Sequence, residues 1–169
     1  MLPAILDHLR ANRDFIANVV AWERIPARPA RYGPLPEMVD PRLAAALRAR
    51  GIDQLYSHQA AAIGAVARGE NVVVATATAS GKSLAYTLPV LSRLAARPDA
   101  RALYLFPTKA LAHDQEAETA ALIAAARLPV AVNTYDGDTP RGKRSAVRAA
   151  GGVLITNPDI CLLYTSRCV

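Results

Sequence analysis

Short aliphatic runs alternate with longer Ala-rich segments over more than half of the chain. The aliphatic runs, in order, are NVVVA, ALYLF, PVAVNTY and GVLIT. The segments between them are residues 82–96, 109–126 and 139–149. Alternation at these lengths is typical of βαβ units, in which right-handed crossovers join parallel strands. The pattern predicts an α/β fold with a mostly parallel sheet and helices on both faces.

The N-terminal part of the chain has a different composition. Residues 1–45 contain a short apolar opening and then the Pro- and Arg-rich stretch ERIPARPARYGPLPEMVDP, which predicts a short helix followed by an irregular arm. Asp40 can cap a helix that has Pro41 at its first position and ends at Gly51. A further helix is predicted from Ser57 onward. We therefore expect an arm over 1–45 and an α/β domain over 46–160.

Composition restricts the function classes. The chain has 169 residues, half of them hydrophobic, which excludes a disordered protein. A formal charge of +6 favours polyanionic partners such as nucleic acid. Both cysteines lie in the last nine residues, and no uncharged run is long enough to span a membrane, so we expect a cytoplasmic protein with no membrane partner. The oligomeric state does not follow from the sequence.

The stretch VVVATATASGKSLAY contains the clearest candidate for a ligand-binding site. Six small residues connect a predicted strand to a helix that begins at Lys82, an arrangement that lets backbone N–H groups converge on phosphate oxygens at a helix N-terminus. Lys82 is expected to reach the β and γ phosphates, and Ser83 to place its hydroxyl on Mg²⁺. The predicted ATP-binding loop consists of Thr76, Ala77, Thr78, Ala79, Ser80, Gly81, Lys82 and Ser83. The alternative is a purely structural strand-to-helix turn, because Thr76 stands where the strict motif has glycine.

Together with LYSHQAAAI, FPTKALAHDQ, TYDGDTP and TNPD, this loop resembles the DEAD/DEAH-box helicases of superfamily 2. The similarity covers about residues 25–160 and is strongest to the bacterial subgroup that contains the mitomycin repair factor A helicases. In that family the first residue of the loop is commonly Ala or Thr. The resemblance implies a RecA-like P-loop domain that uses ATP and Mg²⁺ and acts on nucleic acid, with single-stranded DNA as the expected partner and DNA repair as the expected role.

The resemblance also assigns roles outside the loop. Gln59 matches the glutamine that reads adenine, and an amide suits that edge because it donates and accepts together. Tyr56 is expected to pack on the base. The residues expected to contact nucleic acid are Pro107, Thr108, Lys109, Thr156 and Asn157. The alternatives are a solvent-facing Gln59, a Tyr56 that fills a gap between helix and loop, and a Thr108 that only caps a helix.

ATP hydrolysis in the family also needs an Asp-Glu pair at the end of a later strand and arginines from a second RecA-like domain. The acidic residues after Ser83 include no such pair. We therefore expect the first part of a helicase motor domain that does not hydrolyse ATP alone. The last nine residues, CLLYTSRCV, have no counterpart in the resemblance and are interpreted as an artefactual tail. A small P-loop kinase and a non-catalytic nucleic-acid-binding module remain the alternative functions.

Overall fold

The computed structural model describes residues 1–26, 29–77, 80–158 and 160. It divides the chain into two compact units, Met1–Ala30 and a larger unit that starts at Arg31. The predicted domain boundaries at residues 45 and 160 stay predictions. The predicted loop residues Thr78 and Ala79 and the tail 161–169 lie outside the described residues.

The first unit contains two short helices, α1 (Leu2–Ala11) and α2 (Arg13–Ala17). Asn12 separates them and caps α2 by accepting a hydrogen bond from the Phe15 N–H at 3.0 Å. The guanidinium of Arg10 lies 4.8 Å from the ring centre of Trp22. Neither helix buries a residue, so cation–π and local hydrogen bonds hold this unit together.

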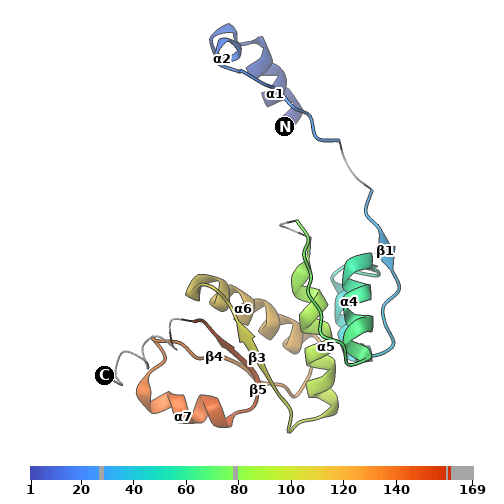
Figure 1. Ribbon diagram of the computed structural model, residues 1–169, viewed down its shortest axis with the longest axis vertical. Coiled ribbons are helices and arrows are strands. Elements are labelled where there is room, and N and C mark those ends of the chain that lie inside the picture. Colours follow the sequence, from blue (N-terminus) through green and yellow to red (C-terminus); the bar gives the residue numbers. More distant parts are fainter. Residues whose placement is uncertain (27–28, 78–79, 159, 161–169) are drawn as a thin grey trace. The chain divides into compact units, whose positions relative to one another are not determined.

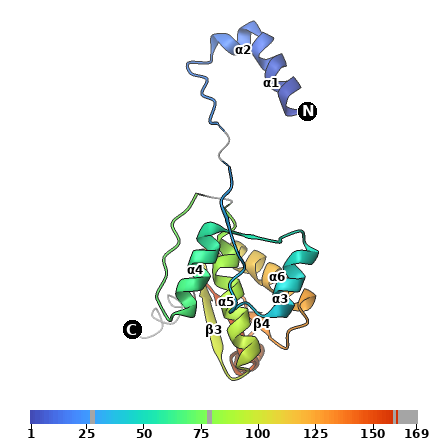
Figure 2. The same cartoon turned by 90° about the vertical axis from the view of Figure 1, so that its right-hand side faces the viewer.

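The second unit begins with a small antiparallel pair and two helices. Strand β1 (Tyr32–Gly33) pairs with β2 (Leu55–Tyr56), and helices α3 (Pro41–Ala49) and α4 (Ser57–Ala67) follow the two strands. The carboxylate of Asp40 accepts from the Arg42 N–H at 2.8 Å, which confirms the predicted cap of α3. Figures 1 and 2 show α4 lying beside the long helix α5 (Lys82–Ala96).

Three parallel strands form the sheet of this unit. Their order is β3 (Arg101–Leu105), β5 (Gly152–Thr156) and β4 (Val132–Thr134), side by side in Figure 1. Helix α6 (Lys109–Ala125) joins β3 to β4, and α7 (Arg141–Ala149) joins β4 to β5. The predicted α/β class and parallel sheet are therefore confirmed.

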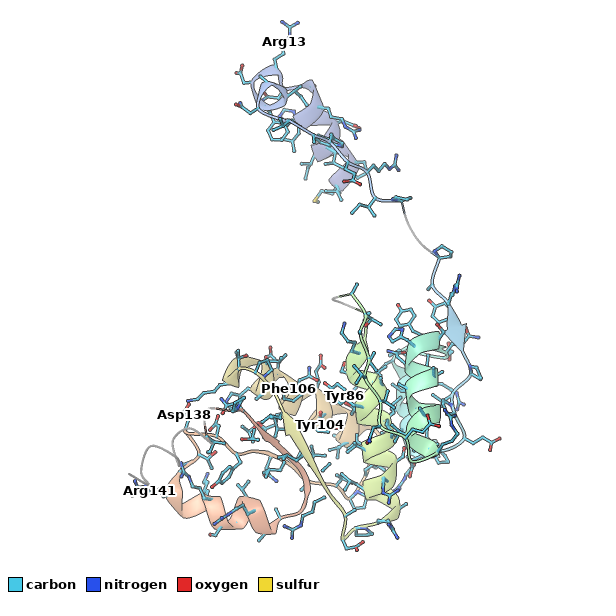
Figure 3. All side chains as sticks on the ribbon, in the orientation of Figure 1. Arg13, Tyr86, Tyr104, Phe106, Asp138 and Arg141 are labelled. Atoms are coloured by element: carbon cyan, nitrogen blue, oxygen red, sulfur yellow. The ribbon has the colours of Figure 1, made fainter. Side chains whose placement is uncertain are left out.

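One face of the sheet holds the core. Tyr104, Val153 and Ile155 are buried on it and pack with Leu88 of α5 and Leu122 of α6. Figure 3 shows the rings of Tyr86, Tyr104 and Phe106 gathered where α5 meets β3, and Tyr86 and Tyr104 meet edge to face at 5.3 Å. The other face is lightly covered: Leu103 and Leu105 are exposed, and Val147 of α7 lines a hollow with Leu103 and Leu154.

The strand predicted over NVVVA is wrong. None of the strands in the described part of the chain pairs with residues 71–77, and Val73 is 94% exposed. Figure 2 shows this segment as an extended trace beside α4, with no strand next to it. Aliphatic, β-branched residues favour extended backbone, but a strand also needs a hydrogen-bonded neighbour, which a local pattern does not specify.

Helix α7 starts two residues later than predicted. The N–H and the hydroxyl of Thr139 both contact the Asp136 carboxylate, at 3.1 and 3.2 Å, which holds the chain in a turn before Pro140. Pro140 is the N-cap, and the helix begins at Arg141. A side chain that binds the local backbone competes in this way with the first turn of a helix.

Candidate nucleotide and nucleic-acid sites

The side chain of Lys82 binds oxygen atoms of its own predicted phosphate loop. Its ammonium donates to the carbonyl oxygens of Thr76 and Ala77, at 2.9 and 2.5 Å, and to Oγ of Ser80 at 3.2 Å. The hydroxyls of Thr76 and Ser80 lie 2.6 Å apart. An ammonium has three donors, so these three oxygens account for all of them. The lysine is thus already surrounded by the kind of oxygen ligands that phosphate would offer.

Gly81 meets a requirement that only glycine satisfies at this point. It is the N-cap of α5 and has φ +70°, in the left-handed region. A Cβ atom there would lie 2.8 Å from Nε2 of Gln59. The absence of a side chain therefore lets α4 and the loop approach closely.

Gln59 connects the two helices of the candidate nucleotide site. Its Oε1 accepts from the Tyr56 N–H at 2.8 Å, and its Nε2 donates to the Gly81 carbonyl at 2.6 Å. The residue is 2% exposed, so the alternative of a solvent-facing glutamine is wrong. A carboxamide has two N–H donors and two acceptor lone pairs, so one of each is not used by these two bonds. Gln59 is therefore placed both to support the loop and to offer a donor and an acceptor to a ligand.

A hollow of about 620 Å³ lies beside Gln59. It is lined by Tyr32, Gly51, Ile52, Asp53, Gln54, Tyr56, Gln59, Gly81 and Leu84. Tyr56 contributes its ring, as predicted for an adenine site, but that ring already stacks with Tyr32 at 5.4 Å and with His58 at 5.8 Å.

Tyr32 and His58 were not identified from the sequence. Tyr32 reaches Tyr56 only because β1 and β2 pair in a register that places the two residues opposite each other. Nε2 of His58 lies 3.1 Å from the Ser80 carbonyl oxygen, which adds a second link between α4 and the loop. The pattern of a tyrosine two residues before a histidine is too common to serve as a signal.

The residues present fit ATP, but they offer few ligands for Mg²⁺. Gln59 and Gly81 both line the hollow, and Lys82 follows Gly81 at the start of α5, so a base in the hollow would have an amide beside it and a phosphate-binding cation on the next residue of the loop. For the metal, the described residues contain no cluster of three or more His, Cys, Asp or Glu side chains. Ser83, in the first turn of α5, would therefore hold Mg²⁺ together with phosphate and water oxygens.

The predicted nucleic-acid residues after β3 lie at the surface. Pro107 and Thr108 are exposed, and Oγ1 of Thr108 caps α6 by accepting from the Leu111 N–H at 3.3 Å. Lys109 donates to Asp138 at 2.7 Å, and this contact lowers the pKa of the Asp138 carboxyl. The cap predicted as the alternative for Thr108 is thus present, and Lys109 is part of an exposed ion pair.

The predicted nucleic-acid residues at the end of β5 are inside the protein. Thr156 is buried and its hydroxyl donates to the Tyr135 carbonyl, at 2.5 Å, while Asn157 is 0% exposed. The Thr156 side chain therefore ties the end of β5 to the loop after β4. The parallel register, with Leu105 beside Thr156 and Thr134 beside Ile155, brings the three loops to one edge of the sheet.

This arrangement of phosphate loop, glutamine and parallel sheet agrees with the comparisons with known proteins. A DEAD/DEAH box helicase family model matches residues 56–167. The chain belongs to the DEAD/DEAH-box helicase family. It is 48% identical over 159 residues, 94% of its length, to the ATP-dependent helicase YprA of Bacillus subtilis, and 35% identical over 169 residues to the ATP-dependent helicase HRQ1 of Saccharomyces cerevisiae.

Solved structures of the family give the same result. A crystal structure of the DUF1998 helicase MrfA bound to DNA and AMPPNP matches 93% of this chain with a TM-score of 0.84 and 48% identity. The predicted similarity to the mitomycin repair factor A subgroup is therefore confirmed. The chain spans 22% of that structure's length, and 21% and 15% of the YprA and HRQ1 sequences. Among the described helices, none is both long and apolar enough to cross a bilayer.

Proposed function

We propose that this chain is the ATP-binding part of an ATP-dependent helicase that acts on DNA, with a role in DNA repair. The observation that carries the proposal is the continuous set of contacts from Tyr56 through Gln59 and Gly81 to Lys82, beside a hollow of nucleotide size. The names of relatives support it, since YprA and HRQ1 are ATP-dependent helicases and MrfA has been crystallised with DNA and AMPPNP.

In this proposal the residues of the loop bind and orient, and they do no covalent chemistry. Lys82 exchanges its three loop oxygens for phosphate oxygens, and Gly81 allows the backbone to approach them. Gln59 reads the base edge while it still holds the Gly81 carbonyl. In the whole protein, ATP would supply the β–γ phosphoanhydride bond, and transfer of the γ-phosphoryl group to water, giving ADP and phosphate, would drive strand separation. The chain itself has no Asp-Glu pair after Ser83, so we expect binding without turnover.

Nucleic acid would follow the edge of the sheet where the loops after β3, β4 and β5 meet. Thr108 and Lys109 would contact phosphates, while Thr156 and Asn157 would hold their loop in place from inside. Contacts of this kind read the backbone and not the bases, so binding should be weakly sequence-specific and steeply salt-dependent. Single-stranded DNA is the partner that we propose.

The test is a titration of a fluorescent ATP analogue in Mg²⁺ buffer into the unaltered chain, Lys82→Ala and the control Arg50→Ala. Arg50 is an exposed cation at the end of α3, outside the candidate site. We expect Lys82→Ala to weaken binding about tenfold or more, because a charge-assisted hydrogen bond contributes about 1.5–3 kcal/mol. Arg50→Ala should bind like the unaltered chain. Equal affinity of all three proteins would contradict the proposal, and DNA binding that ignores ATP would favour a non-catalytic module.

A further inference from the structure

Helix α7 has a charge distribution that packing does not explain. It carries four cationic side chains, Arg141, Lys143, Arg144 and Arg148, and no acidic one, and none of its residues is buried. Three of the four lie in its first turn and a half, where the helix dipole disfavours cations. Like charges at this spacing also repel one another. A bound anion would relieve both effects.

A hollow of about 710 Å³ lies along the same helix. Arg141, Arg144, Ser145 and Arg148 line it from α7, and Tyr135 and Thr139 line it from the preceding loop. Residues three or four positions apart lie on one side of a helix, so the arginines form a row. Figure 3 shows Arg141 and Asp138 at the same end of α7.

The arginines in this row differ in their contacts. Arg144 is structural: its Nε donates to the Thr139 carbonyl at 3.0 Å, and its guanidinium lies 5.8 Å from the ring centre of Tyr135. Arg141 and Arg148 are exposed, and within the described residues neither guanidinium is paired with a carboxylate. The acidic residue in the lining, Asp138, is already paired with Lys109. Among the described residues, the charges of Arg141 and Arg148 are therefore not balanced by a carboxylate.

We infer that this hollow is a second phosphate-binding site, in which Arg141 and Arg148 contact the backbone of a nucleic-acid strand that continues from the edge of the sheet onto α7. The inference rests on the proposed function. It favours nucleic acid over an acidic protein because Asp138, which lines the hollow, is the partner of Lys109, so the hollow adjoins the proposed strand path. Guanidinium groups also match phosphate with two parallel hydrogen bonds.

The experiment measures fluorescence anisotropy of labelled oligo-dT with the complete chain over a range of salt concentrations. The test variant is Arg141→Gln/Arg148→Gln, and Arg50→Gln/Arg97→Gln is a control that removes the same charge from exposed helix ends elsewhere. We expect the α7 variant to bind at least about tenfold more weakly. Its slope of log affinity against log salt should be shallower by about 1.4, because each lost contact to a single strand contributes about 0.7. The control should keep the slope of the unaltered chain.

Three results would overturn the inference: equal weakening of both double variants, equal affinity of the unaltered chain for poly-glutamate and oligo-dT, or no binding of oligo-dT. Binding of the ATP analogue by the α7 variant, at the affinity of the unaltered chain, shows that it is folded. If Lys109→Gln weakens DNA binding and the α7 variant does not, the proposed function stands and this inference fails. If Lys82→Ala leaves nucleotide binding unchanged, the nucleotide part of the proposed function fails by itself.

Discussion

The segment 71–77 and the strand β5 are both short, aliphatic and extended, but their surroundings differ. Val153 and Ile155 of β5 are 0% exposed and have a parallel neighbour on each side. Val73 is almost fully exposed, and no strand in the described part of the chain pairs with its segment. The comparison shows that aliphatic composition gives an extended backbone, whereas burial and pairing come from neighbours elsewhere in the chain.

The loops that follow these two segments differ in the same way. Strand β5 ends at Thr156 and continues into Asn157, both of which are buried, and a hydrogen bond from Thr156 ties this end to the loop after β4. The phosphate loop is held by Lys82 from its own chain segment and by Gln59 and His58 from α4. The candidate nucleotide site therefore depends on a few polar contacts, and the sheet edge depends on the core.

The largest difference between the two regions should be in the loss of stability when an aliphatic side chain is shortened. Ile155→Ala leaves a cavity in the core and should lower the free energy of unfolding by about 2–5 kcal/mol. Val73→Ala removes an exposed side chain and should change it by less than about 0.5 kcal/mol. Urea denaturation followed by circular dichroism measures both. A loss of the same size in both variants would show that residues 71–77 are packed in solution.

Glycine substitutions test the backbone of the two regions. Gly152 has φ +72°, and a Cβ there would collide with the carbonyl oxygen of Ala131, so Gly152→Ala should cost about 2–3 kcal/mol of stability. Gly81→Ala meets the flexible end of the Gln59 side chain and adds the strain of a left-handed backbone, so it should cost about 1–2 kcal/mol, and it should abolish binding of the ATP analogue. Thermal unfolding and the nucleotide titration together check this pair. Unchanged nucleotide binding by Gly81→Ala would argue against close packing of α4 on the loop.

One buried or partly buried polar side chain in each region, at the phosphate loop and at the sheet, forms two hydrogen bonds that connect separate segments. Gln59 joins the Tyr56 N–H to the Gly81 carbonyl, and Glu116 of α6 accepts from the N–H and hydroxyl of Thr134 at 3.1 and 2.7 Å. Gln59→Ala and Glu116→Ala should each lower stability by about 1–2 kcal/mol. Only Gln59→Ala should weaken binding of the ATP analogue. Equal loss of nucleotide affinity in both variants would mean that the effect is one of general stability.

The smallest effect concerns the exposed pair between Lys109 and Asp138. The hydrogen bond from Lys109 holds the pKa of Asp138 below its ordinary value of 3.8. Because the folded-state pKa is the lower one, the contribution of this pair is present above about pH 4 and fades as the pH falls through the folded-state value. An NMR titration of the Asp138 carboxyl should show the lowered pKa, and Lys109→Ala should return it toward 3.8. No shift between the two proteins would place Lys109 away from Asp138.

Local signals in the sequence predicted the helices well. The start of α5 at Lys82, the cap of α3 by Asp40 and the start of α6 after Thr108 each depend on residues within one turn, and the structure contains all three. The strands ALYLF and GVLIT correspond closely to β3 and β5. The helix starts and the cap are determined by neighbours in sequence, which is why they can be predicted; the two strands agree because partners elsewhere in the chain pair with them.

Features that depend on distant residues were predicted poorly. The pairing of β1 with β2 places Tyr32 on Tyr56, and no pattern in either segment indicates the other. The burial of Asn157 depends on the loops around it, and the exposure of Val73 depends on what lies beside the sheet. Gln59 was assigned to the base, but its bond to Gly81 became evident only once α4 and α5 were seen side by side.

That bond has a consequence for how ligands are distinguished. Since one carboxamide contacts both the hollow beside Tyr56 and the backbone of Gly81, recognition of a base and recognition of a phosphate chain share a mechanical link. Base and phosphate would then bind cooperatively, so bound adenosine should raise the affinity for inorganic triphosphate, and bound triphosphate should raise the affinity for adenosine by the same factor. Selectivity for a complete nucleotide would thus depend on one side chain that connects the hollow beside Tyr56 to the backbone of the phosphate loop.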